Sequence, residues 1–459
     1  MSRPDRPTMS PQNRTFMTST VLARPAIPLP PRRGGGNATP ATGTTARLRF
    51  AMRSGPVARP LAHRIALDHT GAGGTPMDAA TQRRWGDQMF ALLAANTTQM
   101  ADDEYVQPVA DYIDPAHARR ERDLLFRRTP LIVAAADELA KPGEFRTVDI
   151  DGISAVIVRQ DDGSLKAFHN VCRHRGCRVV EAECGTARTF TCKFHSWVYG
   201  GDGALRHVPM AEGFAGIDRA QRGLVSLPVV EKHGLVWLIP TAGMAMDIDT
   251  FLGPMNQVLA DLKIPGAAVF RFERFPEKLN WKLVVDTFLE LYHLPYLHTK
   301  TVGRFIEGKG ALNEQFGPHS RFIAPRKSFL PALKDIPADQ RNVADHTVII
   351  HRVFPNAVVV WQRDHVEFWT AVPDGDDPNR CMVRLWLLSP DKVVGEEDRL
   401  RWEKNWDIVR GTVHAEDFPM ARTIQQGFSS GAQDHVIFGR NELGLHEFHR
   451  SLKEALAAA

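Results

Sequence analysis

Two short stretches of the sequence each place one cysteine and one histidine close together. Residues 172–177 read CRHRGC and residues 192–195 read CKFH. They contribute Cys172 with His174 and Cys192 with His195, and 17 residues lie between the two pairs. A [2Fe-2S] cluster that binds two thiolates on one iron and two imidazoles on the other requires this set of side chains. We therefore expect these four residues to hold such a cluster.

A structural zinc site with two cysteines and two histidines is the alternative. Zinc loops usually place two to four residues between their ligands, whereas only Arg173 separates Cys172 from His174. The spacing therefore favours the iron–sulfur cluster over zinc.

A second group of candidate ligands lies in NWKLVVDTFLELYHLPYLH, residues 280–298. Glu290 and His293 are three residues apart, so a helix would place them on one face. His298 is five residues beyond His293, which an ideal helix would rotate away by about 140°. Pro295 lies between them and can kink or end the helix, so that the two imidazoles converge. Two histidines and a carboxylate on one face of Fe(II) leave positions open for O2 and a substrate.

Taken together, CRHRGC…CKFHSW and ELYHLPYLH resemble the Rieske-type non-haem iron oxygenases, specifically the large (alpha) subunits of the aromatic-ring-hydroxylating dioxygenase family. The resemblance extends from about residue 90 to the end of the chain. It implies that His293 and His298 bind a mononuclear Fe(II). It also implies a third ligand, an aspartate on a C-terminal helix. The segment HAEDFPMARTIQQGF resembles that helix, which points to Asp417 with Glu416 as the alternative.

The resemblance further assigns a role to Glu290. In the family, the acid that precedes Tyr-His forms hydrogen bonds with one histidine of each metal site. That contact crosses between neighbouring subunits of a head-to-tail trimer, which a ring-closing interface allows. A carboxylate behind a ligating imidazole also fixes its tautomer and raises its basicity. Asp286 is a weaker candidate, because it lies seven residues before His293. We expect His446 and His449 to cap or pack the C-terminal helix.

Two departures from the family pattern leave the substrate open. Many aromatic-ring dioxygenases have Asp at the position of Glu290, and a Glu there resembles the branch that acts on quaternary amines. An Asn often stands near the iron where this chain has Thr287.

Cys177 separates the oxygenases from the respiratory Rieske proteins. Those proteins resemble the first loop, and a cysteine at this position forms a disulfide with a cysteine inside the second loop. Here the second loop has Lys193 and Phe194 instead. Cys177 is therefore expected to be a small, buried apolar residue.

The resemblance implies an oxygenase component that hydroxylates an organic, aromatic substrate with O2. Its cofactors would be the [2Fe-2S] cluster and mononuclear Fe(II), with electrons from NAD(P)H through a flavin reductase, a ferredoxin, or both. The sequence GAGGTP does not follow a strand, so it is no nucleotide-binding loop. The alternatives are a monooxygenase that demethylates or oxidises an amine or ether, and a Rieske electron-transfer protein. We expect a cytoplasmic homotrimer or a multiple of trimers.

The elements that must position these residues suggest an α+β fold. We expect a helical segment over residues 77–127, an antiparallel β Rieske domain over 128–240, and a catalytic domain over 241–459. Asp-Gly pairs at residues 151–152, 162–163 and 202–203 indicate β-hairpins in the Rieske domain. The resemblance implies a helix-grip catalytic domain, in which a curved sheet wraps a helix. Residues 396–428 are expected to form its long, kinked C-terminal helix.

Residues 1–76 differ from the rest in composition. They contain 11 Arg, no Lys and two acids, which leaves 46 basic and 51 acidic residues in the remainder. The overall charge of +4 therefore gives no argument for nucleic-acid binding. The segment suits a disordered tail, a transit peptide or a wrongly included upstream stretch, and we favour a start at Met77. The sequence has no apolar run of 18 residues, so we expect no membrane association.

Overall fold

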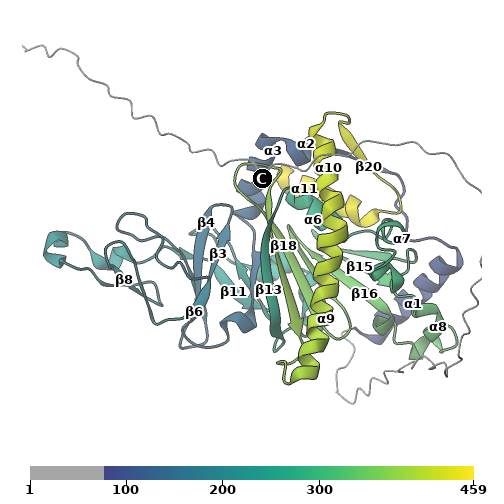
Figure 1. Ribbon diagram of the computed structural model, residues 1–459, viewed down its shortest axis with the longest axis horizontal. Coiled ribbons are helices and arrows are strands. Elements are labelled where there is room, and N and C mark those ends of the chain that lie inside the picture. Colours follow the sequence, from purple (N-terminus) through teal and green to yellow (C-terminus); the bar gives the residue numbers. More distant parts are fainter. Residues whose placement is uncertain (1–76, 459) are drawn as a thin grey trace, which may run out of the picture. The chain divides into compact units, whose positions relative to one another are not determined.

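The computed structural model describes residues 77–458, and the expectations for residues 1–76 lie outside them. The described chain has the expected α+β composition, with antiparallel sheets and flanking helices (Figure 1). It begins with three helices, α1 (Ala79–Ala94), α2 (Ala110–Ile113) and α3 (Pro115–Glu121). The expectation of helix throughout residues 77–127 is wrong at one place. Strand β1 (Tyr105–Pro108) pairs with β20 (His435–Phe438), a partner far away in the sequence.

Small antiparallel sheets carry the cysteine–histidine loops. One has the strand order β10-β5-β4-β3-β6, a second β7-β8-β9 and a third β11-β12-β2. The strands are β2 (Leu131–Ala135), β3 (Glu144–Ile150), β4 (Ile153–Arg159), β5 (Leu165–His169), β6 (Cys184–Thr186), β7 (Thr189–Thr191), β8 (Val198–Gly200), β9 (Leu205–His207), β10 (Ser226–Leu227), β11 (Val229–Lys232) and β12 (Leu235–Leu238). The three Asp-Gly pairs lie in the β3–β4, β4–β5 and β8–β9 turns, as expected. Their glycines have φ of +77°, +81° and +85°, which glycine adopts at little cost.

A seven-stranded antiparallel sheet forms the second half of the molecule. Its order is β13-β19-β18-β17-β16-β15-β14, so that β14 to β19 form an antiparallel meander. The strands are β13 (Ala268–Glu277), β14 (Leu312–Phe316), β15 (His319–Pro325), β16 (Thr347–Val353), β17 (Ala357–Trp361), β18 (Val366–Pro373) and β19 (Cys381–Ser389).

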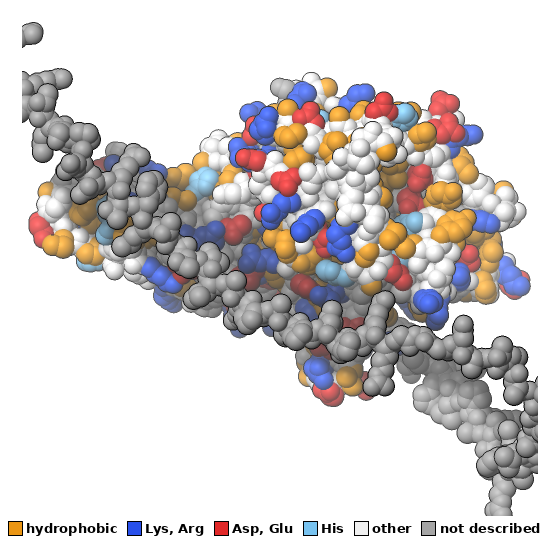
Figure 2. All heavy atoms as spheres, turned by 45° about the horizontal axis from the view of Figure 1, so that its top comes forward, with side chains coloured by type: hydrophobic (Ala, Val, Ile, Leu, Met, Phe, Trp, Pro, Cys, Tyr) orange, Lys and Arg blue, Asp and Glu red, His pale blue; other side chains and the backbone are white. Residues whose placement is uncertain are grey.

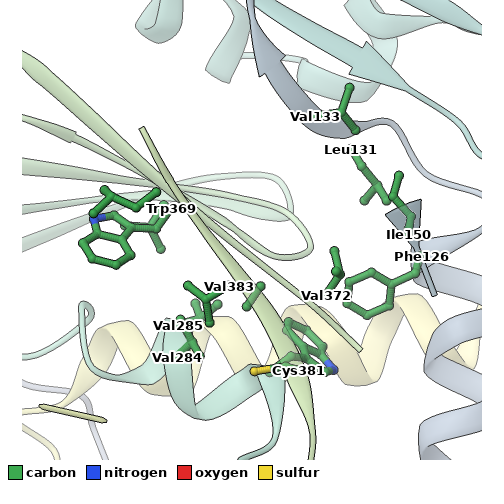
Figure 3. Packing of buried hydrophobic residues seen from close by; sticks show 14 of the residues in the cluster. Phe126, Leu131, Val133, Ile150, Val284, Val285, Trp369, Val372, Cys381 and Val383 are labelled. Atoms are coloured by element: carbon green, nitrogen blue, oxygen red, sulfur yellow. The ribbon is translucent and has the colours of Figure 1, made fainter. Parts of the chain in front are cut away.

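The helices of this half are α4 (Ile248–Leu252), α5 (Met255–Asp261), α6 (Trp281–Asp286), α7 (Leu294–Leu297), α8 (Phe329–Leu333), α9 (Glu396–Thr412), α10 (Phe418–Ser429) and α11 (Leu443–Ala457). The α9–α10 helix runs across the sheet in Figure 1, which is the helix-grip arrangement. Figure 3 shows part of the core, where Trp369 and Val383 of the sheet and Val284 of α6 belong to one buried cluster. Burying each such side chain contributes about 1.5–3 kcal/mol.

The long C-terminal helix contains a wider turn in its middle. Residues Val413–Asp417 form a π-helical turn between α9 and α10. Pro419 lies in the first turn of α10. It has no N–H for the carbonyl of Ala415, and its ring would clash with that carbonyl in a regular helix. The kink expected in this helix is therefore a π-helical turn. Such turns are frequent at functional sites.

The face drawn in Figure 2 has no single dominant charge. On the face drawn in Figure 2, basic and acidic side chains are interspersed among hydrophobic ones. No helix among residues 77–458 is long and apolar enough to cross a membrane.

Candidate metal centres

The two cysteine–histidine loops have the same backbone geometry. In the first, the N–H of Gly176 donates to the carbonyl of Cys172, and in the second the N–H of Ser196 donates to that of Cys192, both at 2.9 Å. Gly176 has φ +80° and Ser196 has φ +55°, so both loops turn through a left-handed residue at the same position. The two loops therefore make the same backbone turn, although the histidine follows the cysteine by two residues in the first loop and by three in the second.

The four predicted cluster residues lie together, with the thiols inside and the imidazoles outside. Cys172 and Cys192 are 3% and 1% exposed, whereas His174 and His195 are partly exposed. The Nδ1 atoms of the two histidines face each other at 3.1 Å. This spacing suits two nitrogens bound to one metal ion. The ring of His174 also stacks on that of Trp197, with centroids 4.9 Å apart.

Tyr199 is a member of this centre that the sequence analysis missed. Its hydroxyl lies 3.3 Å from Sγ of Cys172 and accepts a 2.9 Å hydrogen bond from the N–H of Arg173. Since that N–H is the donor to the oxygen, the hydroxyl hydrogen is free to point at the sulfur. Burial and the neighbouring thiols raise the pKa of Tyr199, which keeps it protonated as a donor.

We predict that Tyr199→Phe lowers the reduction potential of the cluster by roughly 50 mV. The hydrogen bond stabilises the more negative, reduced cluster, and its loss costs about 1 kcal/mol in that state. A redox titration followed by visible absorption or electron paramagnetic resonance measures the shift. Phe190→Leu changes a ring of the same core that packs on Phe145 and has no hydrogen-bonding group, so it serves as the control and should leave the potential unchanged. An unchanged potential in Tyr199→Phe would remove its role.

None of the five cysteines forms a disulfide. Cys177 packs against the core of this region as expected, but it is only partly buried and not fully buried as predicted. Cys184 is exposed on β6.

The second group of candidate ligands does not lie on one helix, which corrects the sequence-based expectation. Helix α6 ends at Asp286, and Thr287 donates a side-chain hydrogen bond to the carbonyl of Val284 at 2.9 Å. After a series of turns, α7 begins with Pro295 in its first turn. His293 is the N-terminal cap of α7 and His298 its C-terminal cap.

This single helical turn explains how histidines five residues apart converge. Both lie at the ends of α7, so neither is bound to the 100° rotation per residue of a regular helix. Their Nε2 atoms are 3.2 Å apart. The backbone at Gly303 passes close to the end of α7. Only glycine fits there, because a Cβ would lie 2.7 Å from the carbonyl oxygen of His298.

Asp417, at the end of the π-helical turn, completes the group. Its Oδ1 lies 3.1 Å from Nε2 of His298 and 3.6 Å from Nε2 of His293. Among residues 77–458, these three are the one group of His, Cys, Asp or Glu side chains whose ligand atoms lie within 4.8 Å of one another.

A carboxylate lies behind each imidazole. Glu290 pairs with Nδ1 of His293 and also accepts the backbone N–H of His293 at 3.1 Å. Glu416 lies 2.6 Å from Nδ1 of His298 and accepts a hydrogen bond from the hydroxyl of Thr301. Glu416, the alternative third ligand, therefore lies on the far side of its histidine, away from the Nε2 atoms.

The electrostatics of this centre favour positive charge. Burial alone would lower the pKa of His298, but hydrogen bonds and charges from Asp417 and Glu416 outweigh it and raise that pKa. Burial likewise opposes ionisation of Glu416, but hydrogen bonds from His298 and Thr301 lower its pKa. A donor set of two imidazole nitrogens and one carboxylate, with a carboxylate behind each imidazole, fits a divalent iron.

Two cavities meet at this centre. The outer cavity, of about 450 Å³, is lined by Asp286, Glu290 and Glu442 together with side chains of α10. The inner cavity, of about 130 Å³, lies between the seven-stranded sheet and the α9–α10 helix. His293, Asp417 and Glu290 line both. The inner walls are largely apolar and include Phe288 and Phe322.

Asp286, which the sequence analysis weighed against Glu290, has other partners. It accepts a hydrogen bond from the hydroxyl of Tyr112 and contacts Nε2 of His449, both at 3.0 Å. His446 contacts the carbonyls of Phe438 and Gly439, which fits its expected structural role. His449 was expected only to cap or pack the C-terminal helix, but it also contacts Asp286, which lines the outer cavity.

Comparisons with known proteins match both halves of the chain. The family model "Rieske [2Fe-2S] domain" matches residues 129–227, and "Ring hydroxylating alpha subunit (catalytic domain)" matches residues 266–458. The glycine betaine monooxygenase oxygenase subunit of Chromohalobacter salexigens is 25% identical over 77% of this chain and 86% of its own length. The alpha subunit of biphenyl 2,3-dioxygenase from Rhodococcus jostii is 30% identical over 48% of this chain and 47% of its own.

Solved structures agree on the fold. The quaternary ammonium Rieske monooxygenase CntA superposes with a TM-score of 0.67 at 19% identity, over 77% of this chain and 96% of that one. A naphthalene 1,2-dioxygenase variant gives 0.62 at 19% identity, over 78% and 94%. The fold and the two centres define an iron-dependent oxygenase with its own electron-transfer domain. The chain belongs to the Rieske-type non-haem iron oxygenases and is an alpha subunit of that family.

Proposed function

We propose that Cys172, His174, Cys192 and His195 hold the [2Fe-2S] cluster and that His293, His298 and Asp417 hold the mononuclear Fe(II). The observation that carries this proposal is the convergence of two Nε2 atoms and one carboxylate oxygen in a chain that also has the paired loops. When bound, the cluster supplies single electrons and the iron activates O2.

The protein side chains prepare the centre for this chemistry. Glu290 and Glu416 hold the two imidazoles with Nε2 facing inward, since each carboxylate contacts Nδ1. The apolar walls of the inner cavity exclude water and receive the apolar part of a substrate. We infer that the substrate enters this cavity and is hydroxylated beside the three ligands.

Electrons reach the mononuclear site from a neighbouring subunit in this proposal. In Figure 1, β8 beside the cluster loops and α7 beside the three ligands lie on opposite sides of the view. Glu290 lines the outer cavity, and in this proposal a cluster histidine of the neighbouring subunit contacts it there. This arrangement needs a closed ring, for which a head-to-tail trimer is our proposal. A ferredoxin, a flavin reductase or both would reduce the cluster in the cytoplasm with electrons from NAD(P)H.

Metal analysis tests the assignment. The proposal predicts about three irons for every two acid-labile sulfides, following from one cluster and one mononuclear site. Two irons for two sulfides would favour an electron carrier, and zinc without sulfide would contradict both. Substrate-dependent O2 uptake with a reductase then tests the activity. Sedimentation analysis tests the trimer.

Phe288 and Phe322 in the inner wall support our first expectation, a substrate with an aromatic or other hydrophobic ring. The oxidation or demethylation of an amine is the second candidate. Glu290 at the bridging position favours it, and so does Glu367, a further buried carboxylate of the inner cavity.

A further inference from the structure

The inner cavity contains one carboxylate, Glu367 on β18, that has no cationic partner. It is 5% exposed and lines the same cavity as His293, His298 and Asp417. No lysine, arginine or histidine of residues 77–458 lies within ion-pair distance of it. The neighbouring His365 is instead paired with Asp364 at 2.8 Å. Buried carboxylates are normally paired, because leaving one without a counter-charge costs free energy.

The hydrogen bonds around Glu367 suit the ionised form. One oxygen accepts from Nε2 of Gln362 at 2.9 Å and the other from Nε1 of Trp369 at 3.3 Å. Both contacts therefore use the carboxylate as an acceptor. A protonated carboxyl would need an acceptor for its own hydrogen, and none of these partners provides one.

The donor orientation of Gln362 is itself fixed. Its side-chain oxygen accepts a 2.8 Å hydrogen bond from Nη2 of Arg326, so its nitrogen must face Glu367. Arg326 also donates to the carbonyl of Thr347 at 3.1 Å. Arg326 therefore orients the amide of Gln362 that donates to Glu367, but it does not itself pair with the carboxylate. Burial raises the pKa of Glu367, and His365, Gln362 and Trp369 oppose that rise.

A second polar group of the cavity has no partner within the protein. The hydroxyl of Thr412 is buried, its residue is 7% exposed, and its Oγ1 makes no hydrogen bond. A threonine in a helix commonly bonds the carbonyl four residues earlier, but this one lines the inner cavity instead. Its free hydroxyl points to a ligand with a polar atom of its own.

We propose that the inner cavity binds a small substrate whose protonated or quaternary amine nitrogen pairs with the carboxylate of Glu367. This inference rests on the proposed oxygenase function and selects the second of its two candidate substrate classes, an amine. The cation supplies the counter-charge that the protein does not, and the hydroxyl of Thr412 donates a hydrogen bond to an oxygen of the same substrate. The apolar walls, including Phe288, accept the carbon groups around the nitrogen. An aromatic face near a cation adds to the attraction.

Pairs of ligands that differ only in charge test the proposal. The probes are choline against 3,3-dimethylbutan-1-ol, and phenyltrimethylammonium against tert-butylbenzene. Calorimetric titration of the metal-loaded enzyme measures their binding without turnover. In at least one pair the cation should bind more than tenfold tighter. In Glu367→Gln the cation should lose about 100-fold in affinity and the neutral partner no more than roughly threefold, since breaking a buried charge pair costs several kcal/mol.

Control variants separate this effect from a loss of structure. Glu447→Gln removes a half-buried carboxylate outside the inner cavity and should keep the preference for the cation. Thr412→Val should lower the affinity for choline by about threefold to tenfold. The affinity for phenyltrimethylammonium, which has no oxygen, should not change. Iron and sulfide contents must match the parent enzyme in each variant.

The outcomes distinguish the two proposals. Equal binding of charged and neutral partners in every pair, or an undiminished preference in Glu367→Gln, would overturn the role of Glu367 while leaving the oxygenase intact. Cation binding that depends on Glu367, without substrate-dependent O2 uptake by any ligand, would support the site and contradict the proposed function.

Discussion

Replacing Asp417 by alanine is expected to abolish oxygenation while the cluster remains intact. Within the described part of the chain, Asp417 is the one carboxylate whose oxygen lies beside the Nε2 atoms of both His293 and His298. Without it, the two imidazoles alone hold the metal weakly, because a facial site needs its third ligand. Substrate-dependent O2 uptake should fall by more than about 100-fold, since even the loss of a residue behind a ligand costs 10–100-fold. Visible absorption should show the unchanged cluster.

Glu416→Ala is the matched control, because the two acids are adjacent in the chain. Glu416 contacts Nδ1 of His298 from behind, so its loss should weaken iron binding by about 10–100-fold. Added Fe(II) should therefore restore oxygenation in Glu416→Ala but not in Asp417→Ala. The reverse pattern would make Glu416 the third ligand. Full activity in Asp417→Ala without added iron would exclude Asp417 from the centre.

The cluster loops show what short-range sequence patterns can predict. The types and spacing of Cys172, His174, Cys192 and His195 predict one shared site, and the structure brings the four residues together. The Asp-Gly pairs lie in turns between strands, as their pattern predicts. These features depend on residues close together in the chain. The hydroxyl of Tyr199 was missed, although it lies only four residues after His195, because its contact with Cys172 crosses from one loop to the other.

The group His293, His298 and Asp417 shows what short-range patterns do not predict, namely the backbone conformation that brings the side chains together. The sequence suggested that Glu290 and His293 share a helix, but the helix ends at Asp286 and the contact arises from turns. Pro295 correctly indicates that the helix is interrupted. It does not reveal that turns separate α6 from the single helical turn of α7. The π-helical turn that presents Asp417 depends on Pro419 and on packing against the sheet, which no local periodicity reveals.

The inner cavity could not be predicted at all. Glu367 follows His365 in an alternating strand, where a charged residue usually faces solvent. Only the fold shows that both faces of β18 are covered and that this carboxylate points into a cavity. Strand β1 was missed for a related reason, since its partner β20 lies more than 300 residues away in the chain.

Glu290→Gln is expected to keep both metals and slow electron transfer between them. Glutamine can still accept the backbone N–H of His293, so the local turn should survive. It loses the charge that holds Nδ1 of His293 and that would meet a histidine of a neighbouring subunit. The reduced enzyme, mixed rapidly with O2 and substrate, should reoxidise its cluster about 10–100-fold more slowly, as for other partners of ligating histidines. Stopped-flow absorption measures this rate in a single turnover.

Glu442→Gln separates the role of Glu290 from the general charge of the outer cavity. Glu442 lines the same cavity, and its carboxylate accepts the backbone N–H of Gly439 at 2.6 Å, a bond that glutamine can keep. Its substitution therefore removes one negative charge without touching His293, and cluster reoxidation should keep its rate. An equal slowing in both variants would mean that cavity charge, and not the contact with His293, controls the transfer. An unchanged rate in Glu290→Gln would remove its bridging role, because electrons would then reach the mononuclear site by a path that does not need this carboxylate.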